Sequence, residues 1–324
     1  MNLKQLSRRT LLGVAFAAAT LPQLAAADER PLEWVVGYAA GGGSDAVARA
    51  VGDAMSKTLG RAVVVNNKPG AATNIAAQYV ATSKDYGNIM FTADFATLAA
   101  NPWLFKKLPY NADKDFIPVG MLARFPMLLV VHPGVPAKNY KEFVEWAKSQ
   151  ANGISYASAG NGSPHHLAGE LLRERSGLKM QHVPYRGAAP AVQDLVGGMI
   201  QVGLMDSASV QQYIAAGKLR AIGVASPARL QVMPEVPTLA EQGLKDYIAY
   251  AWQGLVVPAG TPPETVMKLS QALQVALDST AVKARFQVLA LESMKGTPQQ
   301  MAEFARNERQ RWGKVVQTAG IQLD

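Results

Sequence analysis

Short apolar runs alternate with amphipathic stretches from residue 31 onward, and this alternation predicts an α/β fold with parallel sheets. In the first block, the apolar runs LEWVVGY, AVVVNN and NIMFTAD are separated by helical stretches over residues 44–59 and about 74–81. The strands follow one another at intervals of about 25 residues, as strand–helix–strand units require.

A second block begins near MLLVVHP and repeats the pattern through the strands ISYASAG, MQHVPYRG, IQVGLMD and LRAIGVAS. After Pro227 the alternation of strand and helix patterns ends. A proline-rich loop leads to the extended run IAYAWQGLVVPAG and then to three helical stretches that have no strands of their own. We therefore expect these last helices to return to the first block.

This return predicts a discontinuous first domain and an inserted second domain. The first domain comprises residues 28–126 and 253–324, and the second comprises residues 127–252. Each lobe is expected to be a mostly parallel sheet flanked by helices, with the extended segments 122–131 and 248–257 crossing between the lobes. A ligand cleft is expected between them.

The first 27 residues have the pattern of a removable export signal. Lys4, Arg8 and Arg9 are followed by an apolar run from Leu11 and by three alanines, 25–27, that suit signal cleavage. The two adjacent arginines also fit a twin-arginine signal, and the pattern leaves this route and the general secretory route open. Both routes predict a periplasmic protein.

Composition narrows the function classes. The chain has no cysteine, which excludes disulfides, iron–sulfur clusters, thiolate zinc sites and cysteine nucleophiles. Removal of the export signal reduces the net charge from +8 to +5, and the remaining bases are interspersed with acids. That distribution does not indicate nucleic-acid binding. No later apolar run reaches the ~18 residues that span a bilayer, so we expect a soluble mature protein, acting as a monomer.

The stretch VVGYAAGGGSDAVARAV contains the first candidate site. Gly41, Gly43 and Ala46 satisfy a loose dinucleotide-binding pattern. However, the next strand ends in VVVNNKPG without the acid that contacts the ribose, and Asp45 would repel a pyrophosphate. The Gly-Lys-Ser/Thr of a phosphate-binding loop is also absent. A simple turn with Ser44 capping the helix is one interpretation.

The other interpretation is an anion site. Glycines allow a close approach to the backbone, and the N-terminus of the following helix offers free N–H groups and a positive dipole. We expect Gly41, Gly42, Gly43, Ser44 and Asp45 to receive a carboxylate.

The stretch YASAGNGSPHHLAGELL has the same order of features as the first loop: a strand, a glycine-containing turn and a helix start. A strand ends at Ser158, Gly160 and Gly162 loosen the turn, and Ser163 before Pro164 has the pattern of a helix start. Both loops stand at the carboxyl end of a strand, where open α/β sheets bind ligands. Two such loops, one per lobe, indicate a ligand held between the lobes.

His165 and His166 invite a metal or catalytic interpretation, which the pattern does not favour. Neighbouring helical side chains point about 100° apart, so the two rings cannot easily share one ion. A nucleophile–base pair of Ser163 and His166 remains a weaker alternative, because Ser163 is better explained as a helix cap. We expect no metal, no cofactor and no catalytic residue.

Asp206 ends the strand IQVGLMD and precedes another helix. An acid at that position can cap the helix, and it can also accept a hydrogen bond from a ligand hydroxyl, amine or water.

Taken in order, these stretches resemble the Bug-type extracytoplasmic receptors of tripartite tricarboxylate transporters. The resemblance covers essentially the whole chain after the export signal and includes VVVNNKPGAATNIAA, VPYRGAAPAVQDLVGGMIQVGLMD and QGLVVPAGTP. It implies a type II periplasmic binding fold, two lobes that close on a small carboxylate, and no catalysis. The carboxylate classes are dicarboxylates, tricarboxylates, amino acids and aromatic acids.

The resemblance also places the site. It implies that the two glycine loops, Gly41 to Asp45 and Ser158, Gly160, Gly162 and Ser163, grip the carboxylate, and that Asp206 also belongs to the site. Beyond the resemblance, we expect Asn74, Asp94 and His165 to recognise the rest of the ligand together with Asp206. This chain departs from the family pattern at Ala39-Ala40, where prolines are usual, and this departure lies at one wall of the expected cleft.

The implied partner is an inner-membrane permease. Two alternatives remain open. One is a sensor that presents its closed form to a membrane signalling partner, and the other is a serine hydrolase or dehydrogenase.

Overall fold

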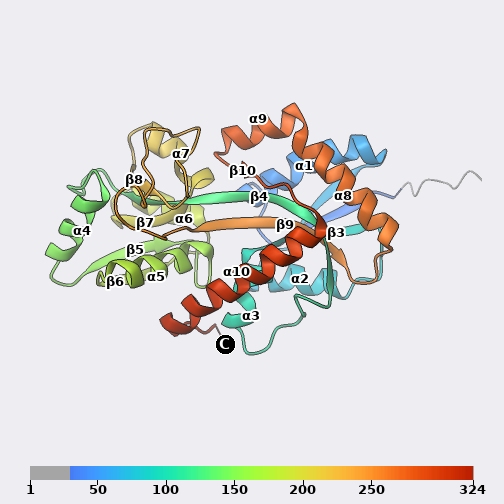
Figure 1. Cartoon of the computed structure of the whole chain (residues 1–324), viewed down its shortest axis with the longest axis horizontal. Coiled ribbons are helices and arrows are strands. Elements are labelled where there is room, and N and C mark those ends of the chain that lie inside the picture. The colour runs from blue at the N-terminus through green and yellow to red at the C-terminus, as the bar shows by residue number, and fades with distance from the viewer. Residues whose placement is uncertain (1–29, 324) are drawn as a thin grey trace, which may run out of the picture. The chain divides into compact units, whose positions relative to one another are not determined.

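One long strand, β4 (Phe116–Val131), organises the sheet of the computed structural model, which describes residues 30–323. Residues 116–126 of β4 pair with β9 (Tyr250–Pro258), and residues 127–131 pair with β7 and β8. Figure 1 shows β4 and β9 running side by side between the two groups of strands. The predicted export signal, residues 1–27, lies outside the described residues.

The first group of strands is parallel at its edge. β1 (Leu32–Val36) lies between β2 (Val63–Asn67) and β3 (Ile89–Asp94), and both pairings are parallel. β9 is antiparallel to β3 and to β4, and the short β10 (Glu292–Ser293) pairs with β4. The parallel strands are the predicted strand–helix–strand units, while the chain that returns from the second group adds antiparallel neighbours.

The second group repeats this arrangement. β5 (Ile154–Ser158) lies between β6 (Met180–Pro184) and β7 (Val202–Asp206) in parallel register. β7 and β8 (Arg220–Val224) are both antiparallel to β4. Within each group, parallel strands therefore end at the same edge, and the loops that follow them lie together.

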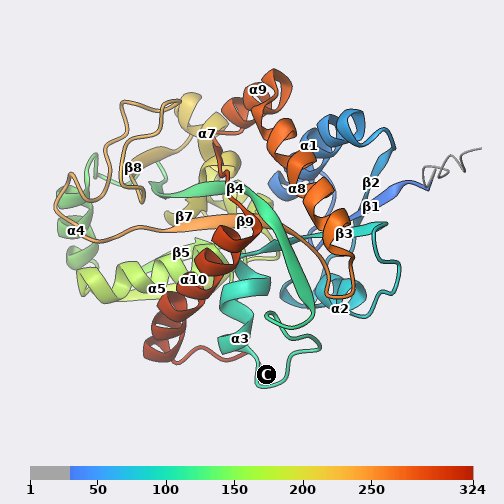
Figure 2. The same cartoon turned by 45° about the vertical axis from the view of Figure 1, so that its right-hand side comes forward.

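Helices cover both groups of strands (Figures 1 and 2). The predicted helix at 44–59 is α1, and the predicted helix at about 74–81 is α2. The helices are α1 (Gly43–Leu59), η1 (Ala71–Thr73), α2 (Asn74–Ala81), η2 (Ala96–Ala100), α3 (Asn101–Leu104), α4 (Tyr140–Ser149), α5 (Pro164–Ser176), α6 (Ala188–Val196), α7 (Ser207–Ala215), α8 (Pro263–Asp278), α9 (Thr280–Val288) and α10 (Pro298–Ala319).

The three final helices return to the first group of strands, as the sequence predicts. α8 and α9 pack on α1, and α10 packs on η2 and β4. The described chain from Pro31 onward forms one compact unit, and the domain limits at 126/127 and 252/253 remain a prediction.

Apolar side chains form three buried clusters around the sheet. One lies between β1, β9 and the helices α1, α8 and α9, and it is centred on residues such as Trp34 and Leu255. Another is packed under α6 and α7. The largest includes Trp252 and Trp312 under α10 and extends to Tyr156 under α5. No helix within residues 30–323 is both long and apolar enough to span a membrane.

Candidate functional site

The glycine loop after β1 begins with Tyr38, whose hydroxyl donates a hydrogen bond to Asp94 Oδ2 at the end of β3. Gly37, just before it, lies so close to Thr73 that a Cβ there would come within 2.9 Å of the threonine Cβ. The end of β1, the start of α2 and the end of β3 are therefore in contact. Small residues at this position follow from that close approach.

Asp94 belongs to a buried polar network. Its Oδ1 accepts hydrogen bonds from the N–H and the hydroxyl of Thr97, at 2.9 and 2.8 Å, and Thr97 Oγ1 lies 2.8 Å from Thr73 Oγ1. Burial raises the pKa of Asp94, and the hydrogen bonds from Tyr38 and Thr97 offset part of that rise. Through its bond to Tyr38, the Asp94 carboxyl anchors the glycine loop to the end of β3.

Asn74 begins α2 and lies in the same region. Its Oδ1 accepts a hydrogen bond of 2.8 Å from Asn101, whose amide also donates to the carbonyl of Ala72 at 2.7 Å. Asn74 and Asp94 are 6% and 3% exposed, so in this structure both act inside the network rather than on an open surface.

α1 begins without a side-chain cap. Its N-cap residue is Gly42, which is exposed, and the first N–H groups of a helix have no partner within it. The expectation that Ser44 caps this helix is wrong. Ser44 lies inside the first turn, and its hydroxyl accepts a hydrogen bond from Gln253 on β9. The α1 N-terminus therefore keeps free donors.

Asp45 folds back on the loop. Its Oδ2 accepts hydrogen bonds from the N–H of Gly41, at 3.0 Å, and from Arg49 Nε, at 2.9 Å. Burial raises the pKa of Asp45, but the bonds from Arg49 and Gly41 outweigh it and the pKa is lowered. The N–H of Gly41 is thus used within the loop, which leaves the amides of Gly42 and Gly43 for an anion.

The loop at 158–163 is satisfied largely by its own atoms. Ser158 Oγ lies 2.5 Å from His182 Nε2 and accepts from the N–H of Gly160 at 3.1 Å. The N–H of Gly162 donates to His166 Nδ1 at 3.1 Å. Fewer backbone donors remain here than in the glycine loop.

Ser163 caps α5, as the sequence predicts, because its hydroxyl accepts from the N–H of His166 at 3.2 Å. Since His166 Nδ1 already accepts from Gly162, this nitrogen is not available as a base for Ser163. The geometry does not support the serine hydrolase alternative.

His165 points to a different partner from His166. Its Nε2 lies 3.0 Å from Asp206 Oδ2 at the end of β7, and both residues are buried. Asp206 also caps α7, with Oδ1 accepting from the N–H of Ser209 at 3.0 Å. Burial raises the pKa of Asp206, but the bonds from His165 and Ser209 outweigh it and lower the pKa. The first turns of α5 and α7 are thereby joined.

At Gly43, the start of α1 approaches the first turn of α7. A Cβ on Gly43 would lie 3.0 Å from the ring of Phe125 on β4 and 3.9 Å from the Cβ of Ala208 in the first turn of α7. The N-terminus of α1 therefore lies beside Phe125 and the first turn of α7, and the His165–Asp206 bond joins that turn to the N-terminus of α5. Helix N-termini carry partial positive charge, and their convergence favours an anion.

No local sequence motif marks three of the residues in this region as part of a site. Tyr38, Phe125 and Gln253 gain their roles from contacts with residues that are far away along the chain. Within residues 30–323, no group of three or more histidine, aspartate and glutamate side chains is placed to hold a metal ion.

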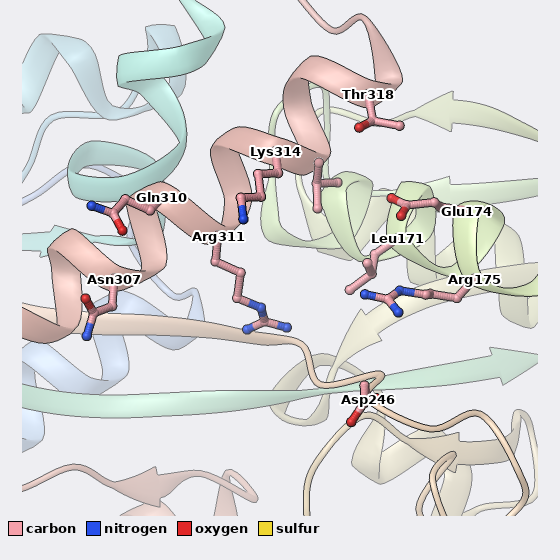
Figure 3. A pocket seen from close by; sticks show the side chains of 10 residues that line it. Leu171, Glu174, Arg175, Asp246, Asn307, Gln310, Arg311, Lys314 and Thr318 are labelled. Atoms are coloured by element: carbon pink, nitrogen blue, oxygen red, sulfur yellow. The ribbon is translucent and has the colours of Figure 1, made fainter.

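A cavity of about 490 Å³ lies elsewhere, between α5 and α10 (Figure 3). None of the predicted site residues lines it. Its lining is Leu171, Glu174, Arg175, Asp246, Asn307, Gln310, Arg311, Lys314, Val315 and Thr318. This cavity is an alternative ligand site to the region where the N-termini of α1, α5 and α7 meet.

Comparison with known proteins agrees with this fold. Residues 47–321 match the family described as tripartite tricarboxylate transporter family receptor. BugT of Bordetella pertussis is 31% identical over 327 residues, which cover 100% of both chains.

Solved structures are similar as well. MatC from Rhodopseudomonas palustris with bound malate is 34% identical, with a TM-score of 0.80 over 88% of this chain and 98% of that one. Another R. palustris protein, with adipate, is 30% identical, with a TM-score of 0.86 over 91% of this chain and 99% of that one.

The fold is that of a two-lobed α/β solute-binding protein. The chain belongs to the receptor family of the tripartite tricarboxylate transporters, the Bug-type receptors.

Proposed function

We propose that this chain is a periplasmic receptor that binds a small carboxylate between its two lobes and delivers it to a membrane transporter of the tripartite tricarboxylate type. The observation that carries the proposal is the meeting of the α1, α5 and α7 N-termini, with α1 uncapped at Gly42. Malate and adipate are the ligands of two similar proteins, and both are dicarboxylates.

In this proposal, the N–H groups of Gly42 and Gly43 hold one carboxylate of the solute. Asp45 keeps the loop in shape through its bond to Gly41, and the Tyr38–Asp94 pair holds the loop on β3. Closure about β4 and β9 traps the solute, and the closed surface is what the permease recognises.

A thermal-shift screen of the chain without residues 1–27 tests this function. The panel is L-malate, succinate, adipate, citrate, L-glutamate and benzoate, each at millimolar concentration, with glucose as the control. A ligand present at 1,000 times its Kd stabilises the folded state by about 4 kcal/mol. Stabilisation by one or more carboxylates, with the ligand recovered unchanged, supports the receptor. A silent panel contradicts it.

Delivery is tested separately. We expect a strain that lacks the receptor to lose uptake of the labelled carboxylate and to regain it on complementation. Unchanged uptake in that strain contradicts the transport role.

A further inference from the structure

Gln253 carries one bonded and one unbonded amide atom. Nε2 donates a hydrogen bond to the hydroxyl of Ser44, whereas Oε1 is buried and has no hydrogen-bond partner within residues 30–323. The residue is only 4% exposed. A buried acceptor without a donor costs free energy, and such atoms are rare in folded proteins. The unused oxygen therefore points to a partner that the chain itself does not supply.

This oxygen lies beside the proposed carboxylate site. Ser44 stands in the first turn of α1, directly after Gly42 and Gly43, whose N–H groups are proposed to hold the carboxylate. Oε1 and Nε2 are attached to the same carbon, so the free acceptor is next to the Ser44 hydroxyl. β9, which carries Gln253, runs beside β4 between the two groups of strands (Figure 1). A solute bound at the start of α1 is a neighbour of this amide.

The two side chains opposite Gln253 do not supply the missing donor. Asp94 on β3 and Ala123 on β4 stand opposite it, and directly opposite residues of antiparallel strands share one face of the sheet. Both carboxyl oxygens of Asp94 already accept hydrogen bonds, from Tyr38 and Thr97. Alanine has no polar side-chain atom. A donor carried by the solute fits this position.

Such a donor has a defined place on the solute. When a carboxylate is held by the N–H groups of Gly42 and Gly43, the nearest substituent is the one on the adjacent carbon, carbon 2. A hydroxyl or ammonium group there can donate to Oε1 of Gln253, whereas a methylene leaves the oxygen without a partner. A site that is built to bond a solute hydroxyl rejects the analogue without it, because the polar group of the site is then left unpaired.

We propose that Gln253 Oε1 accepts a hydrogen bond from a hydroxyl or amino group on carbon 2 of the bound acid. The receptor thereby selects 2-hydroxy or 2-amino dicarboxylates over unsubstituted ones. The inference rests on the proposed receptor function and adds a solute class and a specificity-determining residue to it.

Isothermal titration calorimetry with dicarboxylates of equal chain length tests this selectivity. The probes are L-malate, D-malate, L-aspartate and succinate, so the arms separate a hydroxyl from an amino group and one enantiomer from the other. We expect at least one substituted acid to bind about tenfold or more tightly than succinate. Succinate that binds as tightly as the best substituted acid overturns the inference and leaves the receptor intact. If all the probes fail to bind, the inference is overturned, and the wider thermal-shift panel decides on the receptor.

Gln253→Met removes both amide atoms and keeps the length of the side chain. We expect the preference for the substituted acid over succinate to fall to within about threefold, through weaker binding of the substituted acid. Gln274→Met on α8 is the matched control, because it removes an amide that donates to the carbonyl of Gly296, and it should keep the wild-type preference. Equal preferences in the two variants overturn the assignment to Gln253.

The side-chain amide signals of Gln253 provide a readout in the unmodified chain. A new hydrogen bond to Oε1 polarises the amide, so we expect these signals to shift more with the preferred substituted acid than with succinate. Identical Gln253 side-chain shifts in the two complexes contradict the contact.

Discussion

Gln253 on β9 donates a hydrogen bond to the hydroxyl of Ser44 in the first turn of α1, across 209 positions of the chain. Gln253 also stands opposite Asp94 in the register of β3 and β9, so the two side chains share one face of the sheet. The glycine loop is thereby fixed to the strands from both of its ends, through Tyr38 at the start and Ser44 at the end.

Removal of the Ser44 hydroxyl alone should destabilise the fold more than removal of both the Ser44 hydroxyl and the Gln253 amide that donates to it. The other amide atom of Gln253, Oε1, is buried without a partner, so Ser44→Ala leaves the whole amide unbonded. We expect a loss of about 1–3 kcal/mol in the free energy of unfolding, and a smaller loss in Ser44→Ala/Gln253→Leu. Urea denaturation of the full double-mutant cycle measures both. Strict additivity of the single changes would contradict the contact.

Bulk at Gly42 should block binding without harming the fold. Gly42 has φ −81° and ψ 174°, which any residue adopts, and a Cβ there meets nothing closer than the Ala39 carbonyl at 3.6 Å. We expect Gly42→Val to keep the wild-type Tm and to lose at least about tenfold in affinity, with Gly42→Ala in between. Isothermal titration calorimetry measures the affinity, and thermal unfolding followed by circular dichroism measures the Tm. Wild-type affinity in Gly42→Val would place the ligand elsewhere.

Gly162 does not offer an equally clean test. Its φ is +71°, and an added Cβ would lie 2.6 Å from Leu104 Cδ1. A substitution there strains the backbone and displaces α3, so a loss of binding would report on folding.

Ser163→Ala should affect stability rather than affinity. The hydroxyl caps α5 by accepting from the N–H of His166 and also donates to the carbonyl of Gly160 at 2.7 Å. We expect about 1 kcal/mol less stability toward urea and a change in Kd below about threefold. A large loss of affinity at unchanged stability would instead make the hydroxyl a ligand contact.

Acid should destabilise the protein through His166 and His182. The two rings stack with their centroids 3.7 Å apart, and burial lowers the pKa of each to about 4. The unfolded chain, with histidine pKa values near 6.5, binds more protons between pH 4 and 6.5. The free energy of unfolding therefore falls as the pH is lowered through this window, by roughly 1–2 kcal/mol per pH unit.

Denaturant titrations between pH 4 and 7.5 measure that slope. His182→Phe keeps an aromatic ring over His166 and removes one of the two titrating groups, so it should reduce the slope. A slope that is unchanged in His182→Phe would assign the acid sensitivity to other groups.

Much of this fold follows from the sequence pattern, because local signals specify it. Glycines and apolar periodicity gave α1 and α2 nearly to the residue, and the Ser163-Pro164 start of α5 is a cap that the structure contains. The apolar run from Leu122 to Val131 predicts most of β4, which begins six residues earlier in the structure, at Phe116.

The contacts that assemble the site could not be predicted in this way. The Ser44–Gln253 bond and the approach of Gly43 to Ala208 depend on how the second group of strands returns to the first. Ala71, Ala72 and Thr73 all adopt positive φ before α2, a conformation that alanine and threonine do not signal. Long-range packing imposes these features, and a single sequence carries no local mark of them.

Amide chemical shifts on addition of a dicarboxylate locate the bound solute on the chain. With L-malate, succinate or adipate, we expect the largest changes at Gly42, Gly43 and His165, where the N-termini of α1, α5 and α7 meet. Changes concentrated at Arg175, Lys314 and the other residues of the α5–α10 cavity (Figure 3) would contradict it.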